Sequence, residues 1–385
     1  MRLTQLFKDF SESEKAGGLT LIACTIISMV AANSFIGLEY SHFWHTQLGG
    51  QSIEYWINDG VMTIFFLLIG LELEREIYIG ELSNVKDALL PIFGAIGGMM
   101  IPAAIYMYIN FGTDTQSGAG IPMATDIAFA LGVLSLLGNR VPISLKVFLT
   151  ALAVIDDLGA ILVIAIFYTK IIIWANLGIA LSIFLFLILL NRLKIRNLIP
   201  YLFGGVLMWY FMLNSGVHAT ITGVLLAFAI PFGNGDKKST SYILQHFLHK
   251  PVAFIILPLF ALANTAIAVD SSFSEIVSQN YGLGILLGLI IGKPLGITSL
   301  VFIAVKLGIC KLPNELNWKM IIGAGCLGGI GFTMSIFITL LAFEGYSLQN
   351  NSKIVILIAS FVAATIGFFY LSFTVKKTSK FKLNT

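Results

Sequence analysis

The chain has 385 residues, of which 57% are hydrophobic and only 11% are charged, and its formal net charge is +3. This composition excludes a soluble globular domain and is typical of a protein that crosses a lipid bilayer many times. We expect no nucleic acid partner. No disulfide framework is suggested either, because the three cysteines lie in different predicted segments and read as packing residues.

The N-terminus carries a short amphipathic pattern. Its apolar residues follow the helical spacing i, i+3, i+4, i+7, which predicts a helix lying on the membrane surface, with an apolar face of Leu3, Leu6, Phe7 and Phe10. The charges among the first 15 residues, and the lack of a long apolar core there, argue against a cleaved signal peptide.

Twelve apolar stretches follow, and each predicts a membrane-spanning helix. They cover residues 16–35, 59–79, 88–109, 121–138, 143–168, 171–190, 198–213, 217–232, 251–270, 282–304, 319–343 and 353–375. With the N-terminus inside, this alternation places 20 of the 23 basic residues on the inner side and two, Lys170 and Lys353, outside, while Lys293 lies within a span. The asymmetry predicts a multi-pass protein with both termini cytoplasmic.

Two spans contain glycine and proline at a density that weakens a helix. The fourth opens with GAGIPMATD (118–126) and the eleventh with GAGCLGGIG (323–331). Irregular backbone at membrane depth is tolerated only where protein or a water-filled cavity satisfies it. We therefore expect two broken helices, and an inverted repeat in which spans three to five recur upside down as spans ten to twelve.

Asp156 and Asp157 stand side by side in the fifth span. An aspartate at the centre of a membrane helix costs roughly 2.5–3.5 kcal/mol on insertion scales, so an adjacent pair indicates a function, and at least one of the two should exchange a proton near neutral pH. They point about 100° apart on a regular helix. We expect Asp157 to be a cation ligand facing a water-filled cavity, while Asp156 either co-ligates or pairs with Lys293. Such oxygen ligands suit sodium or lithium, and Thr125 is a candidate hydroxyl ligand.

Few other ionisable groups lie at membrane depth. Asp126 is expected to offset the N-terminal dipole ends of the half-helices and Lys293 their C-terminal ends, although a purely structural pairing of Asp126 is the alternative. Asp59 lies nearer the end of a span. His218 is more often a packed, hydrogen-bonded histidine than a functional one.

The inner end of the second span is acidic. Glu72 and Glu76 are four residues apart on one helical face, where they would attract cations. His246 and His249 precede the ninth span and titrate in the right range for a response to pH. The alternative interpretation is that the glutamates and the histidines lie on ordinary solvated helix ends.

Eight motifs, which occur in order through nearly the whole chain, resemble the NhaA family of sodium/proton antiporters of bacterial inner membranes. They are WINDG (56–60), FFLLIGLE (65–72), PMATDIAF (122–129), IDDLGA (155–160), SGVHAT (215–220), LPLFALAN (257–264), GKP (292–294) and GIGFTMS (329–335). The resemblance implies an electrogenic, pH-regulated antiporter that exports cytoplasmic sodium or lithium in exchange for external protons by alternating access.

The resemblance also implies an all-α polytopic fold of twelve transmembrane helices with inverted-topology repeats, broken in spans 4 and 11. Its core domain would take spans 3–5 (within 88–170) and spans 10–12 (within 282–375). Its interface domain would take the surface helix and spans 1–2 (1–87) and spans 6–9 (171–281). A basic cytoplasmic tail (376–385) completes the division.

Roles carried over by the resemblance fall on matching positions. Asp157 and Asp156 would bind the cation and carry protons, Lys293 would pair with Asp156, and Asp126 with Thr125 would support the crossed half-helices. Residues linked in the family to pH response or structure match Asp59, Glu72, Glu76, His218, His246 and His249.

Three departures from the family pattern bear on regulation and assembly. Gln245 stands where a glutamate is expected in the pH-responsive cluster, and Glu74 stands where a basic residue is common. The segment 36–55, which forms an external hairpin helping dimerisation in the family, is shortened here. We therefore expect the pH threshold to differ from that of the family, and the shortened segment leaves the homodimer open.

Competition is the expected mechanism: cation and protons cannot occupy the same carboxylates, so loading one expels the other. No cofactor is expected beyond the transported ions, and the sequence has no Gly-x-x-x-x-Gly-Lys-[Ser/Thr] motif for ATP. The nearest alternative is a sodium-coupled symporter of an organic solute on the same scaffold, which needs a roomier cavity. An intramembrane aspartyl protease needs aspartates on two facing helices, and a structural protein has no use for the doublet with Lys293, so we expect no enzyme.

Overall fold

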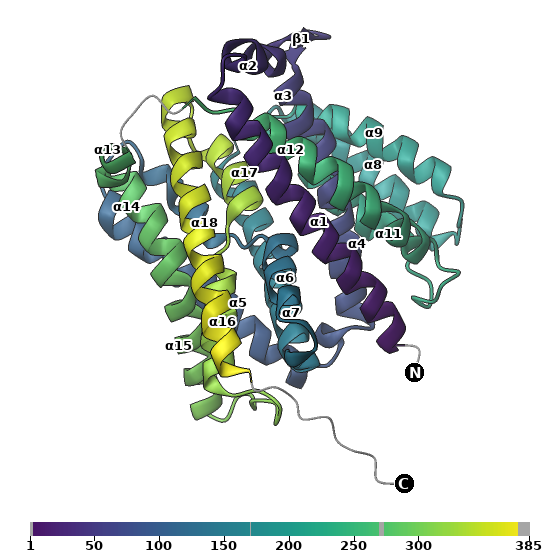
Figure 1. Ribbon diagram of the computed structural model, residues 1–385. Coiled ribbons are helices and arrows are strands. Elements are labelled where there is room, and N and C mark those ends of the chain that lie inside the picture. The colour runs from purple at the N-terminus through teal and green to yellow at the C-terminus, as the bar shows by residue number, and fades with distance from the viewer. Residues whose placement is uncertain (1–2, 170, 269–272, 376–385) are drawn as a thin grey trace.

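The computed structural model describes residues 3–169, 171–268 and 273–375, which are predominantly helical (Figure 1). In chain order the elements are α1 (Leu3–Ala32), α2 (Gly37–His45), β1 (Gln47–Leu48), β2 (Gln51–Ser52), α3 (Ile53–Tyr55), η1 (Trp56–Val61), α4 (Met62–Tyr78), η2 (Glu81–Ser83), α5 (Val85–Asn110), η3 (Gln116–Met123), α6 (Ile127–Leu136), η4 (Gly138–Arg140), α7 (Ile143–Phe167), α8 (Trp174–Arg192), α9 (Leu198–Leu213), α10 (Ile221–Ala229), α11 (Thr240–Pro251), η5 (Val252–Ile256), α12 (Leu257–Asn264), α13 (Phe273–Ser278), α14 (Asn280–Leu287), η6 (Gly288–Gly292), α15 (Lys293–Lys306), α16 (Trp318–Gly328), α17 (Phe332–Ala342) and α18 (Tyr346–Thr374).

Within these residues, eight helices are long and apolar enough to cross a membrane, or up to ten if each of two bent pairs counts as one span. The predicted span 198–213 corresponds to α9. In the predicted span 217–232, only the nine residues of α10 are helical. At 1.5 Å per residue α10 is about 14 Å long, roughly half the hydrocarbon thickness. The residues before α10 form turns and bends, among them Gly216 with a φ of +87°.

The N-terminal segment forms one helix. The stretch predicted as a surface helix and the first predicted span are continuous in the backbone of α1. The side chains of Leu3, Leu6, Phe7 and Phe10 lie outside the described part of the chain, and so do Lys170 and the tail 376–385.

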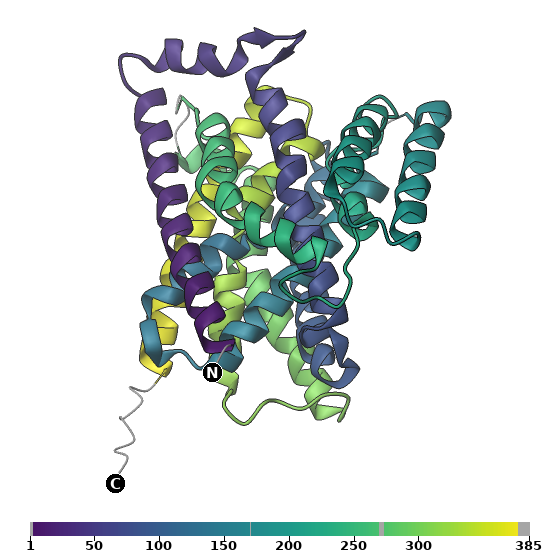
Figure 2. The same cartoon turned by 90° about the vertical axis from the view of Figure 1, so that its right-hand side faces the viewer.

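Figures 1 and 2 show the start of α1 and the end of α18 at one end of the molecule, with α2 and the β-hairpin at the other. Strands β1 and β2 pair antiparallel, with Gln47 opposite Ser52. Gly49 and Gly50 connect them with φ of +62° and +89°. Positive φ at both central residues is what a tight type I′ hairpin turn requires, and glycine adopts it without steric cost.

Helices α5 and α15 cross unusually closely, because both have glycine at the crossing. A Cβ added to Gly97 would lie 2.0 Å from the carbonyl oxygen of Gly296, and the reverse substitution would make the same contact. Small residues at a crossing let two membrane helices approach backbone to backbone. This approach fixes the start of α15, and with it Lys293, which follows the π-helical turn η6 directly.

Helices α8 and α9 stand at the side of the molecule (Figure 2). Only 11% of the apolar window of α8 is buried, whereas 61% of the corresponding window of α7 is buried. An apolar helix that stays uncovered suits contact with lipid tails, and a covered one suits the protein interior. Helix α7, which carries the aspartate doublet, is therefore among the helices that form the core.

Candidate functional site

Two interrupted segments meet near the middle of the fold. In the first, η3 ends at Met123 and α6 begins at Ile127; in the second, α16 and α17 are bent by 47° at a short break. The Thr125 hydroxyl donates to the Gly328 carbonyl (2.8 Å), and the Asp126 N–H donates to the Ile330 carbonyl (2.6 Å). Each interruption thus satisfies polar groups that the other leaves free, as backbone away from water requires.

Asp126 holds the beginnings of two helices. Its Oδ1 accepts the Phe129 N–H (2.9 Å), and its Oδ2 accepts both the N–H (3.1 Å) and the hydroxyl (2.6 Å) of Thr333. The residue is 2% exposed. A single buried carboxylate therefore caps α6 and lies at the first turn of α17, where the helix dipoles favour negative charge.

Lys293 lies beside the aspartate doublet on α7. Its Nζ donates to Asp156 Oδ2 (2.5 Å) and to the Thr125 hydroxyl (2.8 Å), and the lysine side chain is fully buried. Of the two roles left open for Asp156, the structure has the pairing with Lys293. The second oxygen of Asp156, Oδ1, has no hydrogen-bond partner among the described residues.

Asp157 is buried without any donor. Neither of its carboxylate oxygens has a hydrogen-bond partner in the described ranges, and the residue is 1% exposed. The charges of Asp156, Asp126, Glu72 and Lys293 act on it. Buried polar groups are nearly always satisfied, so a bare buried carboxylate suits a bound proton or a hard cation. The expected water-filled cavity does not expose Asp157, which is 1% accessible to solvent.

The acidic end of α4 and the two histidines lie on neighbouring helices, since α4 packs against α11. Glu72 and Glu76 are half-buried, His249 is half-buried and His246 is exposed. Nearby, the Glu81 N–H donates to Glu76 Oε2 (3.0 Å). Burial, together with the charges of Glu76 and Asp87, raises the pKa of Glu81 above its ordinary value. The region is therefore rich in negative charge.

Glu74 was treated in the sequence only as a departure from the family pattern, yet it is 3% exposed. The Ser241 hydroxyl of α11 donates to its Oε2 (3.2 Å). The Arg75 guanidinium lies 5.3 Å from the centre of the Tyr242 ring, which in turn stacks on His246. The sequence signalled this contact between α4 and α11 only through helix geometry. Glu74 lies about 200° around the helix from Glu72 and from Glu76, and therefore on a different face.

Asp59 and His218 form a separate pair away from the doublet. Asp59 Oδ1 lies 3.6 Å from His218 Nδ1, and the His218 ring packs edge-on against Phe337. The Asp59 carbonyl accepts the Thr63 hydroxyl and the Trp209 indole N–H. His218 is thus packed, in line with the more ordinary of its two interpretations, but beside an acidic group.

The long apolar helices, the crossing of two interrupted segments and the buried acids beside a lysine are features of a multi-pass membrane transporter. The Na+/H+ antiporter 1 family matches residues 8–371. The chain belongs to this family, which confirms the resemblance seen in the sequence.

Named relatives agree with this assignment. The chain is 72% identical to the Na(+)/H(+) antiporter NhaA of Flavobacterium psychrophilum, with 98% of each chain covered. It is 65% identical to Na(+)/H(+) antiporter NhaA 1 of Flavobacterium johnsoniae (97% of this chain, 98% of the relative) and 47% identical to that of Clostridium beijerinckii (94% and 93%). The protein is a sodium/proton antiporter, with Na+ and H+ as its transported ions, which favours antiport over symport of an organic solute.

Proposed function

We propose that this antiporter exports cytoplasmic Na+ or Li+ across the bacterial inner membrane in exchange for external protons, and that Asp157 is the group both ions share. The observation that carries the proposal is the bare Asp157 carboxylate, buried one residue from the Asp156–Lys293 pair. A carboxylate so placed is neutral when protonated and needs a cation when ionised, because an isolated buried charge is strongly unfavourable.

Competition between the two occupants then produces exchange. Asp157 and the free oxygen of Asp156 bind the cation, with the Thr125 hydroxyl as a further ligand. Lys293 is the charge partner that keeps Asp156 ionised while the site is empty of cation. Asp157 carries one proton, and the Asp156–Lys293 pair gives up a second proton as sodium enters, so about two protons are exchanged for one sodium. The cycle is therefore electrogenic, and a membrane potential worth roughly 2.3 kcal/mol per charge per 100 mV drives sodium export. The chain needs no cofactor beyond these ions.

The proposed architecture has twelve spans with both termini cytoplasmic and the lipid bilayer around them. Segments η3–α6 and α16–α17 act as broken helices 4 and 11, in which Asp126 and Lys293 compensate the dipole ends. A core domain (88–170 and 282–375) moves against an interface domain (1–87 and 171–281), giving alternating access. Residues 376–385 form a basic cytoplasmic tail. A homodimer would form through the hairpin of segment 36–55, which is shorter here than in the family.

Regulation by pH is proposed to involve Glu72, Glu76, His246, His249, His218 and Asp59. The first four lie on α4 and α11, which pack against each other, so that a change of charge on one helix changes the electrostatic potential at the other. Compared with the family pattern, Gln245 removes an acidic side chain from this pair of helices, and the buried Glu74 adds one. The pH threshold therefore follows the balance of these two positions rather than the common family pattern.

The test is Asp157→Asn, measured in everted membrane vesicles by recovery of a quenched acridine dye after addition of Na+ or Li+. We expect cation-dependent proton release to disappear, because the amide can neither ionise nor carry the proton. Asp114→Asn is the matched control, since Asp114 is exposed in a connecting segment, and it should exchange normally. Full exchange by Asp157→Asn, at equal protein level, would contradict the proposal.

A further inference from the structure

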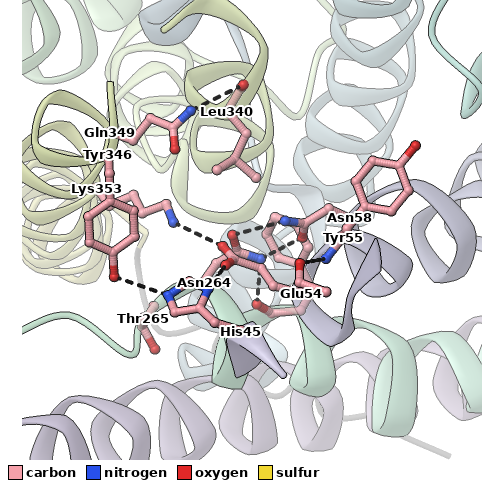
Figure 3. A network of polar contacts seen from close by, with 12 residues as sticks. His45, Glu54, Tyr55, Asn58, Asn264, Thr265, Leu340, Tyr346, Gln349 and Lys353 are labelled. Atoms are coloured by element: carbon pink, nitrogen blue, oxygen red, sulfur yellow. Dashed lines mark hydrogen bonds and ion pairs between the residues drawn. The ribbon is translucent and has the colours of Figure 1, made fainter. Parts of the chain in front are cut away.

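A second polar cluster lies at the opposite end of the molecule from the termini (Figures 1 and 3). Lys353 Nζ on α18 is 3.7 Å from Glu54 Oε1 on α3, and His45 Nδ1 at the end of α2 is 3.4 Å from Glu54 Oε2. His45 Nε2 lies 3.4 Å from the Tyr346 hydroxyl at the start of α18. One carboxylate is thus held from both sides, by residues far apart in the chain.

Lys353 is the unexpected member of this cluster. The sequence placed it among the basic residues of external loops, but the structure shows it 3% exposed on the second turn of α18. A lysine is almost never buried so completely unless it is paired. Glu54 is the acid that the structure places within ion-pair distance of it, so the burial of Lys353 depends on α3 remaining in place.

The surroundings of the cluster are polar on several sides. A small pocket that opens to solvent is lined by both ion-pair partners, His45, Tyr346 and Asn264. Asn264, on α12, donates to Asn58 Oδ1 (2.7 Å) in η1 (Figure 3). The ion-pair contacts therefore join α18 to α2 and α3, and the Asn264–Asn58 hydrogen bond joins α12 to η1 beside them.

We infer that the Lys353–Glu54–His45 cluster is an external latch that holds the two moving domains together on the side away from the termini. This inference rests on the proposed division into core and interface domains and on the proposed sidedness, because α18 belongs to the one and α2 and α3 to the other. Sliding of the core must separate Lys353 from Glu54. A buried lysine without its acid is strongly unfavourable, so the latch favours the arrangement with the external side closed.

A latch of this kind changes the population of the two arrangements without touching the ion site. Loosening it raises the population of the outward-open arrangement. Because only the cytoplasm-facing arrangement binds cytoplasmic sodium, the apparent affinity for sodium falls on that face and rises on the external face. A merely structural pair would lower stability or insertion and would change both faces in the same direction.

The experiment measures the KM for Na+ from each face, in everted and in right-side-out vesicles. For Glu54→Gln we expect the external KM to fall about threefold and the cytoplasmic KM to rise by a smaller factor, because the cytoplasm-facing arrangement that the latch favours is already the more populated of the two. The double variant Glu54→Lys with Lys353→Glu restores the pair in reverse and should return both values toward wild type. Glu39→Gln, at an exposed site on α2, is the control that should change neither.

Unchanged KM values in Glu54→Gln, or values that move in the same direction on both faces, would overturn the latch. If Glu54→Gln does not insert, Glu54→Asp, which keeps the charge and shortens its reach, is measured in the same way and read by the same criteria. The proposed ion site is tested separately by Asp157→Asn. Loss of the opposed KM shifts would leave that site standing, and exchange by Asp157→Asn would leave the latch standing.

Discussion

Lys293 Nζ lies 2.5 Å from Asp156 Oδ2, whereas the neighbouring Asp157 carboxylate on α7 accepts no hydrogen bond from any residue that the structure describes. Adjacent acids on one helix thus have different surroundings, because their side chains point about 100° apart. The paired acid is satisfied within the protein, and the bare one is left for the transported ions. The predictions below follow from this division and from the contacts that maintain it.

Lys293→Met should destabilise the protein by about 3–5 kcal/mol, because it leaves Asp156 buried and ionised without a partner. Adding Asp156→Asn in the same chain removes the stranded charge, so the double variant should unfold at a higher temperature than Lys293→Met alone. Thermal unfolding in detergent measures both. Equal melting of the single and the double variant would show that the pair does not act as a unit.

Thr333→Val should cost about 1–3 kcal/mol, since the valine cannot donate to Asp126 and one oxygen of that buried carboxylate loses its shortest hydrogen bond. Thr298→Val is the matched control on α15. The Thr298 hydroxyl is buried without a partner among the residues described, so its loss should be nearly neutral. The comparison is made by thermal unfolding of the two variants side by side, and the idea fails if both behave alike.

Gly97→Ala should destabilise by about 1–3 kcal/mol or more, because the added methyl meets the carbonyl of Gly296 and the two backbones must separate. Gly178→Ala is the control, since an added Cβ there meets nothing within 4 Å and alanine favours the helix. Both variants are compared by melting temperature and by sodium-dependent proton release. A wild-type response from Gly97→Ala would mean that α5 and α15 do not need this close approach.

Sodium itself should stabilise the folded protein at a pH where Asp157 is ionised. At a concentration one hundred times its dissociation constant, a ligand that binds only the native state adds about 2.7 kcal/mol. Choline chloride at the same ionic strength should add nothing comparable. In Asp157→Asn the sodium effect should vanish, and a sodium shift of full size in that variant would place the cation elsewhere.

Much of the fold could be predicted from hydropathy. The spans around α5, α7 and α8 were placed within a few residues, because long apolar runs leave helices as the way to satisfy the backbone. Helix α18 begins at Tyr346, seven residues before the predicted start of its span at residue 353. One exception was 251–270, where the helical segment instead runs from Thr240 to Asn264. Another was 217–232, where apolar character is continuous but only α10 is helical. Apolar composition alone does not show whether a run is helical throughout or begins with turns, and here it begins with turns.

The residues of the ion site could be predicted where a charged side chain lies in an apolar run. Burying the charges of Asp156, Asp157 and Lys293 is unfavourable unless another group compensates them. The contacts of Glu74 and Lys353 were not predictable, because both belong to segments with ordinary loop or helix-end composition. Their burial depends on the packing of α11 and of α3, which are distant in sequence. Local pattern carries no information on that packing.

The double role of Asp126 has a consequence for biogenesis. Its partners at Ile330 and Thr333 are made some 200 residues later than Asp126 itself. When synthesis has reached only α15, the start of α6 still lacks its hydrogen-bond partners at Ile330 and Thr333. Segment η3–α6 must therefore stay in the translocon or in lipid with these polar groups unsatisfied. Maturation of the ion site is a late event that awaits the arrival of α17, and truncations upstream of that helix cannot produce a partly working exchanger.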